Sequence, residues 1–411
     1  MRRLTIAACL VVASCGPDGG ALPAATVPST SSPVAVTTTS IPVTTPATDA
    51  PTTTVDLAPR AGRPEVSFQL VAQVGALTDA LVDPTGTRLL VVEQAGRILD
   101  VTDGNAATLL DITDRTAAEG ERGALGATFS RNGQWIIVNY TSNRDDTKGN
   151  TVVAAYPVRA DGAIDPAQER VLLTVDQPYA NHNGGDLITL NDGTVLVAMG
   201  DGGSGGDPDR VAHRLDSPLG KILRIDGPDV SGIADSNPFV DVDDVRADIW
   251  SSGLRNPWRI DVDPSTGDLW VADVGQNDFE EISVARAGDG IAGGAAIDFG
   301  WSTAEGNTPF NEDVSPDPRT TVVEPVHVYA HGADGCSISG GMLYRASAIE
   351  SLWGWYVFAD FCAGEIRALN PTTGDVVELG NVEQPTGVVR GIGGEPVIVS
   401  ATGRVVSVGP P

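Results

Sequence analysis

The sequence predicts an all-β protein, and more specifically a six-bladed β-propeller. Three observations lead to this class. Short runs rich in Val, Leu, Ile and Trp recur six times, each beside a Gly-containing turn; no helical periodicity is sustained; and glycine is abundant, at 48 of 411 residues. Recurring hairpin units are typical of propellers, whose blades are small antiparallel sheets around a central channel. A β-sandwich is the alternative, but the repeats extend over more chain than one sandwich uses.

Residues 1–14 predict a lipoprotein-type signal peptide. Arg2 and Arg3 precede an apolar run, Leu4 to Ala13, which is too short to span a bilayer as a mature helix. The run ends in "VASC", residues 12–15, which resembles the lipobox of bacterial lipoproteins. Cys15 is therefore the predicted lipidation site, and the outer face of a bacterial cell membrane is the predicted location. An ordinary signal peptide is the alternative.

Residues 15–62 predict a disordered tether between this anchor and the propeller. Thr, Pro and Ser dominate the segment, as in "TTTSIPVTTPATDAPTTT", and no apolar face recurs. Such a segment cannot bury enough surface to offset the entropy lost on ordering. The propeller is accordingly predicted over residues 63–411.

The charge balance limits the partners. The formal net charge is −28 and the isoelectric point is about 4.3. A surface this acidic repels nucleic acid and anionic lipid headgroups. No nucleic-acid partner is expected, and membrane contact is expected only through the lipid anchor.

The cysteines predict one disulfide. Cys9 lies in the signal and Cys15 is the candidate anchor, which leaves Cys336 and Cys362 as a pair in an exported protein. Free buried thiols or a metal site are the alternatives, and two cysteines without a nearby histidine pair make a poor zinc site.

Each expected blade is marked by one turn-and-strand repeat. The repeats are "DPTGTRLLVVEQAGRILDV" from Asp83, "SRNGQWIIVNY" from Ser130, "LNDGTVLVAMGDGG" from Leu190, "DPSTGDLWVADVGQ" from Asp263, "LWGWYVFADFCAGEIRAL" from Leu352 and "GGEPVIVSATGRVVSV" from Gly393. Their spacing is irregular, so insertions lie between units. In a propeller the loops at one end of the blades converge on the channel, and residues distant in sequence can meet there.

Three short motifs carry candidate chemistry. "NHNGGDL", residues 181–187, places His182 in a turn before a strand, where a neutral imidazole can act as a general base; a turn histidine satisfied by the backbone is the alternative. Further on, Arg255 and Asn256 precede Pro257, and a guanidinium beside an amide suits an oxyanion or several hydroxyls. An ordinary surface ion pair is the alternative for Arg255. "VGQN", residues 274–277, ends a strand in a turn whose carbonyls suit Ca²⁺.

Several ordered motifs resemble one known family. They are "EGERGALGATFS", "NHNGGDL", "GDGG", "GKILRID", "GLRNP", "VGQNDFEEI", "DFGWSTAEGN", "CSISGGMLYRA" and "YVFADFCAGEIRAL". Over roughly residues 70–408 the chain is similar to the glucose/sorbosone dehydrogenase group, six-bladed propellers that include soluble quinoprotein sugar dehydrogenases. "VGQN" and "CSISGG" resemble the branch shared with hedgehog-interacting-protein-like proteins.

The resemblance implies roles for the candidate residues. His182 would take the proton of a sugar hydroxyl while a hydride passes to pyrroloquinoline quinone (PQQ), and Arg255 would stabilise charge on the quinone oxygen. The cofactor pocket would be lined by Glu121, Asn181, Asn256 and Tyr344. Gly275 and Gln276 would offer backbone carbonyls to a Ca²⁺ that also binds PQQ.

The predicted function is therefore PQQ- and Ca²⁺-dependent oxidation of a sugar or polyol, with an external electron acceptor. The alternative is a non-catalytic propeller that binds a glycan or protein. It is favoured by the absence of cations for the PQQ carboxylates. The best-known members hold these carboxylates with a Lys and paired Arg, but the equivalent positions here fall on Cys362 and on residues 384–387, "QPTG", which carry no positive charge. A Ca²⁺-dependent propeller lactonase is a third alternative, which would need clustered acidic metal ligands.

Overall fold

The computed structural model describes residues 56–232, 234–288, 292–332 and 334–411. The chain divides into two units, Met1–Thr54 and Val55–Pro411, and the described residues belong to the second. The predicted signal peptide, Cys15 and most of the predicted tether lie outside the described residues. Within the described part, no helix combines the length and the apolar character needed to cross a membrane.

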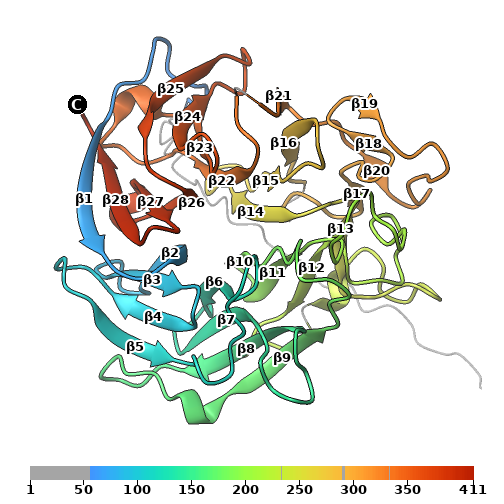
Figure 1. Ribbon diagram of the computed structural model, residues 1–411, viewed down its shortest axis with the longest axis horizontal. Coiled ribbons are helices and arrows are strands. Elements are labelled where there is room, and N and C mark those ends of the chain that lie inside the picture. Colours follow the sequence, from blue (N-terminus) through green and yellow to red (C-terminus); the bar gives the residue numbers. More distant parts are fainter. Residues whose placement is uncertain (1–55, 233, 289–291, 333) are drawn as a thin grey trace, which may run out of the picture. The chain divides into compact units, whose positions relative to one another are not determined.

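The second unit is a β-propeller with six blades (Figure 1). Five blades are four-stranded antiparallel sheets. They comprise β2 (Leu77–Val82), β3 (Leu89–Glu93), β4 (Arg97–Asp100) and β5 (Ala107–Asp111); β6 (Ala124–Phe129), β7 (Trp135–Thr141), β8 (Thr151–Pro157) and β9 (Arg170–Val175); β14 (Pro257–Val262), β15 (Leu269–Asp273), β16 (Phe279–Ala285) and β21 (His327–Ala330); β22 (Ile338–Leu343), β23 (Tyr356–Asp360), β24 (Glu365–Leu369) and β25 (Val376–Asn381); and β26 (Pro385–Arg390), β27 (Pro396–Ser400), β28 (Arg404–Gly409) and β1 (Ser67–Gln73).

The remaining blade is larger, because two short strands from an insertion extend it. It contains β10 (Leu187–Thr189), β11 (Thr194–Met199), β12 (Lys221–Asp226), β13 (Ile249–Ser252), β17 (Ile297–Asp298) and β20 (Thr321–Val322). The last two strands pair in parallel. Outside the blades are a β18 (Ala304–Glu305) and β19 (Thr308–Pro309) hairpin and four 3₁₀ turns, η1 (Pro166–Gln168), η2 (Ala234–Ser236), η3 (Glu350–Leu352) and η4 (Ile392–Gly394).

The innermost strands form a closed ring. Each of β2, β6, β10, β14, β22 and β26 contacts the inner strand of the next blade, and β26 returns to β2. The ring is closed by the two ends of the described chain, because β1 pairs antiparallel with β28. Figure 1 shows this as a blue strand beside the red C-terminal blade.

The six repeats identified in the sequence correspond one to one with the six blades. Each repeat contains the second strand of its sheet, namely β3, β7, β11, β15, β23 and β27. These strands are buried on both faces; β11, for example, is buried at every position. The six-bladed prediction is therefore confirmed.

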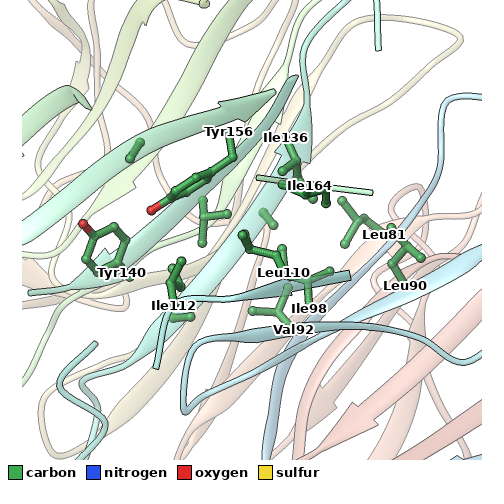
Figure 2. Close-up of a cluster of buried hydrophobic side chains, with 14 of the residues drawn as sticks. Leu81, Leu90, Val92, Ile98, Leu110, Ile112, Ile136, Tyr140, Tyr156 and Ile164 are labelled. Carbon is green, nitrogen blue, oxygen red and sulfur yellow. The ribbon is translucent and has the colours of Figure 1, made fainter. Parts of the chain in front are cut away.

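Hydrophobic layers between neighbouring blades hold the ring together. One such layer joins the β2–β5 and β6–β9 blades (Figure 2). Ile98 and Leu110 of the first blade pack with Ile136 and Tyr156 of the second, and each is at most 2% exposed. Burial of each such side chain contributes about 1.5–3 kcal/mol.

One buried arginine occupies the channel axis. Arg259 of β14 is 2% exposed and donates to the carbonyl oxygens of Thr78 in β2 and Leu125 in β6. It also lies 3.8 Å from Asp186, directly before β10. At Gly340 of β22 an added Cβ would lie 2.1 Å from the Arg259 Cβ, so only glycine leaves room there. Arg259 thus separates the two ends of the channel.

Candidate active site

A cavity of about 470 Å³ opens at the end of the channel where the inner strands begin. It is lined by Leu77, Thr78, Gln94, Gly120, Glu121, Asn181, His182, Arg255, Asn256, Trp258, Val274, Gly275, Gln276, His331, Cys336, Ser337, Ile338, Ser339, Phe361, Thr386 and Ala401. Seven residues proposed from the sequence for catalysis, cofactor or metal binding therefore meet here, together with one disulfide cysteine. They come from loops of different blades, as the propeller topology predicts.

The imidazole of His182 is oriented by a buried carboxylate. Its Nδ1 lies 2.7 Å from Oδ1 of Asp201, whose side chain is fully buried. Asp201 also accepts from the backbone N–H of Gly203 and from Nε1 of Trp301, each at 2.9 Å. Because an ionised carboxylate only accepts, Nδ1 carries the proton. The lone pair is then on Nε2, which has no hydrogen-bond partner among the described residues.

The backbone around His182 is built for this placement. His182 adopts φ +56°, a left-handed conformation that is uncommon outside glycine. An added Cβ at Gly200 would lie 2.0 Å from the carbonyl oxygen of His182, so glycine is required where the two segments cross. The turn is also tied to Glu121, whose Oε2 accepts from the backbone N–H of His182 at 2.7 Å.

Arg255 and Asn256 are held by one buried aspartate. Both oxygens of Asp273 accept backbone N–H groups, from Arg255 at 2.9 Å and from Asn256 at 2.6 Å. Burial raises the pKa of Asp273 to about 7, against the opposing effect of these two hydrogen bonds. The Asn256 side chain accepts from the backbone N–H of Gly184 at 3.0 Å and donates to Glu121 at 3.3 Å, so it links the two segments.

The guanidinium of Arg255 is buried without a carboxylate partner. It is 7% exposed, donates to the Val274 carbonyl at 2.9 Å and to Oε1 of Gln276 at 3.2 Å, and lies 5.7 Å from the Trp301 ring. No salt bridge to Arg255 occurs among the described residues. Asp273 acts on the guanidinium only through space, so an anionic ligand would supply the direct charge partner that this buried cation lacks.

The turn that carries Gly275 and Gln276 is organised by Glu305. Its Oε1 accepts four consecutive backbone N–H groups, from Gln276 to Phe279, at 2.7–3.1 Å. Burial raises the pKa of Glu305, but these hydrogen bonds outweigh it and leave the pKa below its usual value. The N–H of Gly275 is directed instead at Oε2 of Glu280, 3.4 Å away. The carbonyl oxygens of Gly275 and Gln276 have no donors among the described residues.

A cation at this turn would depend on those carbonyl oxygens. In the described part of the chain, no group of three or more His, Cys, Asp or Glu side chains is arranged to hold a metal ion. Carbonyl oxygens are ligands that Ca²⁺ accepts readily. The donors present therefore fit Ca²⁺ better than zinc or another transition metal.

The predicted disulfide joins the segment before β22 to the turn after β23. Cys336 and Cys362 are bonded, with a Cα–Cα distance of 5.6 Å. Asp360 supports both halves, since its oxygens accept the backbone N–H groups of Cys336 and Cys362 at 3.1 and 2.9 Å. The disulfide prediction is confirmed, and the bridge stabilises one side of the cavity.

A second imidazole lines the same cavity. Nε2 of His331 lies 2.5 Å from Oε1 of Glu280, and this hydrogen bond raises the pKa of His331. Glu280 is fixed in turn by the backbone N–H of Ile338 at 2.9 Å. Only weak sequence signals mark His331 and Asp201, the second residue of "GDGG". Neither is adjacent in sequence to the residue that it supports or contacts.

Tyr344 is the exception among the proposed site residues. It follows β22, whose first residue, Ile338, lines the cavity, so the whole strand separates it from the site. Its hydroxyl donates to Glu395 at 2.8 Å and accepts from the backbone N–H of Ile349 at 2.8 Å. Tyr344 is fully buried within a hydrophobic cluster and does not line this cavity.

Comparison with known proteins agrees with this geometry. The model of the family described as Glucose / Sorbosone dehydrogenase matches residues 79–396. The chain belongs to this family. The HIPL1 protein of Arabidopsis thaliana is 30% identical over 57% of this chain and 35% of its own length. The Aldose sugar dehydrogenase YliI of Escherichia coli is 26% identical over 59% of this chain and 63% of its own length.

The chain thus spans about a third of the plant relative and somewhat under two thirds of the bacterial one. Among solved structures, the apo soluble Aldose sugar dehydrogenase of Escherichia coli matches with a TM-score of 0.67 at 20% identity, covering 84% of this chain and 100% of that one. The PQQ-bound Aldose Sugar Dehydrogenase of Streptomyces coelicolor matches with a TM-score of 0.62 at 20% identity, covering 85% and 99%. At this identity the two structures support the fold.

The cavity of this glucose/sorbosone dehydrogenase family member has donors that fit PQQ on one side. Arg255 supplies an unpaired positive charge, and the adjacent turn supplies free carbonyls for a Ca²⁺. Two further arginines that follow inner strands are already paired: Arg345 with Asp263 and Arg390, the last residue of β26, with Asp261. Neither lines the cavity, so Arg255 is the one arginine among its lining residues.

Proposed function

We propose that the chain oxidises a hydroxyl group of a sugar or polyol in this cavity, in a PQQ- and Ca²⁺-dependent reaction. The carrying observation is that the unoccupied Nε2 of His182 and the unpaired guanidinium of Arg255 line one cavity. Alcohol oxidation needs a base for the hydroxyl proton and a positive group near the hydride acceptor. Membership of the Glucose / Sorbosone dehydrogenase family supports a sugar-dehydrogenase type of chemistry.

Each residue has a specific task in this proposal. Nε2 of His182 accepts the hydroxyl proton, and Asp201 keeps the imidazole in the required tautomer and stabilises it once it is protonated. Arg255 binds an anionic acceptor, and its contact with Trp301 limits the positions that the guanidinium can adopt. PQQ, when bound, would supply the hydride acceptor, and Ca²⁺ at Gly275 and Gln276 would polarise it. An external acceptor would then regenerate the oxidised cofactor.

A second candidate is a propeller that binds a glycan or protein without catalysis. It is favoured by the single arginine among the lining residues, because PQQ carries three carboxylates. The Hedgehog-interacting protein of Homo sapiens, 25% identical over 58% of this chain, is a relative whose name describes binding. A lactonase has less support, since the described residues contain no acidic metal cluster.

We also propose that the chain is exported and held at the outer face of a bacterial membrane through a lipid on Cys15. Its support is the signal-like sequence together with the Cys336–Cys362 disulfide, since disulfides are typical of exported proteins. Mass spectrometry of the cell-derived protein would test it. An unmodified Cys15, or an uncleaved leader, would contradict it.

Reconstitution tests the proposed activity. The purified full chain is mixed with PQQ and Ca²⁺, and dye reduction is measured with a panel of aldoses and polyols. We expect turnover that His182→Gln lowers by about 10³-fold or more, as expected for loss of a general base. His213→Gln is the matched control, because His213 also pairs with a buried aspartate, Asp298 at 2.8 Å, but does not line the cavity.

The same experiment separates the candidates. Saturable PQQ binding without turnover would favour a binding role or an untested substrate class. Absence of PQQ binding would eliminate the quinoprotein mechanism. Equal losses in the His182 and His213 variants would indicate a folding effect and remove His182 from the mechanism.

A further inference from the structure

The residues that line the cavity include two chemically different groups. One group is Arg255 with the Gly275–Gln276 turn. The other is a set of hydrogen-bond acceptors, Gln94, Glu121 and His182, which we call the acceptor wall. The difference between the two groups indicates how a ligand would be oriented.

Glu121 is the charged member of the acceptor wall. Its Oε2 accepts from the backbone N–H of His182 at 2.7 Å and from the Asn256 side chain at 3.3 Å. These bonds fix the carboxylate beside the general base. Among the described residues, Oε1 of Glu121 has no donor and the side chain has no ion-pair partner. One carboxylate oxygen is therefore available to a ligand.

Gln94 presents a second acceptor. Its Nε2 donates to two backbone carbonyls, those of Gly120 and Arg122, each at 2.8 Å. This assigns the amide orientation and leaves Oε1 without a donor in the described part of the chain. Together with Nε2 of His182, three acceptors without donors belong to one wall.

We propose that the acceptor wall binds neighbouring hydroxyl groups of a neutral or aminated sugar, and that Glu121 excludes acidic sugars. Hydroxyl and ammonium groups donate to such a wall, whereas a sugar carboxylate only accepts and adds a second negative charge beside Glu121. The inference rests on the proposed function and assigns the two groups of lining residues, with Arg255 and its turn for the cofactor and Glu121 for the substrate. It makes Glu121 a specificity-determining residue.

The test compares three sugars that share one ring: glucose, glucosamine and glucuronic acid. Glu121→Gln is nearly isosteric and can still accept from His182 with its carbonyl oxygen, but it removes the charge. We expect the ratio of kcat/KM for glucose to that for glucuronic acid to fall by about tenfold or more in this variant. PQQ affinity, measured by titration without substrate, should change less than this ratio.

Two controls keep the result specific. Glu119→Gln makes the same substitution two residues away, at a side chain that is 78% exposed and absent from the cavity lining, and it should leave both quantities unchanged. Glu121→Asp keeps the charge with a shorter side chain, so discrimination against glucuronic acid should persist while KM for glucose rises.

A binding measurement separates this inference from the proposed activity. Equilibrium binding of the three sugars to the full chain is measured without PQQ, and the same change of preference is expected in the Glu121→Gln variant. If turnover is never observed but this preference changes, the inference stands and the proposed activity fails. An unchanged preference in both assays, no sugar binding in either, or a change in PQQ affinity larger than the change in sugar preference would overturn it.

Discussion

Replacing Arg259 by Met should destabilise the propeller in a pH-dependent way. The substitution keeps the length of the side chain but removes the guanidinium that donates to Thr78, to Leu125 and, at 3.0 Å, to the carbonyl of Trp258. It also leaves Asp186 buried without its cation. Breaking a buried charge pair from one side costs about 3–5 kcal/mol.

The expected melting shift follows from the size of the unit. Unfolding entropy near the midpoint is roughly 2.1 cal/mol/K per residue, so a unit spanning Val55–Pro411 has about 0.7 kcal/mol/K. A loss of 3–5 kcal/mol therefore lowers the melting temperature by about 4–7 °C near pH 8.

The pH dependence has a definite sign. Burial raises the pKa of Asp186 to about 7, although Arg259 opposes the rise and Asp79 adds to it. Between the unfolded pKa near 3.8 and this value, the folded state binds more protons, so the stability contributed by protonated Asp186 is lost as pH rises. Without Arg259 the folded pKa rises further. Arg259→Met should therefore cost less at pH 5, where Asp186 can stay protonated, than at pH 8.

Calorimetric or fluorescence melts at pH 5 and pH 8 provide the assay. Arg319→Met is the matched control, since Arg319 pairs with Asp317 at the surface and 46% of its side chain is exposed. This substitution should change the free energy of unfolding by less than about 1 kcal/mol. Adding Asp186→Asn to Arg259→Met should restore part of the lost stability at pH 8. A variant that melts within 1 °C of the parent, or whose loss is the same at both pH values, would refute the assignment of Arg259 as the central cross-link.

Three other outcomes follow from the site. Asp201→Asn should lower kcat by about 10³–10⁴-fold with little change in melting temperature, because the wrong His182 tautomer is then favoured; steady-state kinetics would show this, and a parent-like kcat would contradict it. Reducing the Cys336–Cys362 bridge should lower stability by about 2–4 kcal/mol in denaturant unfolding, and an unchanged midpoint would count against it. Glu305→Ala should weaken Ca²⁺ binding measured by calorimetry, and a Ca²⁺ affinity equal to that of the parent would exclude this role. The same variant should be less stable above about pH 4.5, where the Glu305 carboxylate is ionised in both the folded and the unfolded state.

The fold could be predicted because each blade repeats a local signal. A Gly-containing turn followed by a doubly buried strand marks the second strand of every sheet, and this pattern depends on nearby residues alone. Pairings between distant segments left no such signal. The closure of β1 on β28 and the parallel addition of β17 and β20 to one blade depend on contacts across the fold, which periodicity does not encode.

The site could be predicted where residues fall in loops at one end of the blades. Tyr344 differs because it lies just beyond the far end of β22, and six strand residues at roughly 3.3 Å each carry it about 20 Å from the cavity end. The partners of the proposed base and of the second imidazole were not identified from sequence. Asp201 and Glu280 are two of many acidic residues, and only the folded geometry distinguishes the ones that orient a ring.

Carboxylates at the two ends of the channel differ in how many of their oxygens accept hydrogen bonds from the protein. Beyond Arg259, Asp79, Asp186 and Asp261 each use one oxygen to accept a backbone N–H from a neighbouring inner strand, at 3.0, 2.8 and 2.8 Å. Their other oxygens accept from Ala80, Leu187 and Arg390. These carboxylates join blades, and each of their oxygens already accepts a hydrogen bond from the protein. Glu121, at the His182 end, has one oxygen without a donor in the described chain.

Arg259 closes the passage between the two ends of the channel. A ligand that needs both Glu121 and His182 must therefore enter from the His182 end. Variants at Asp79 or Asp261 should accordingly change stability rather than substrate choice.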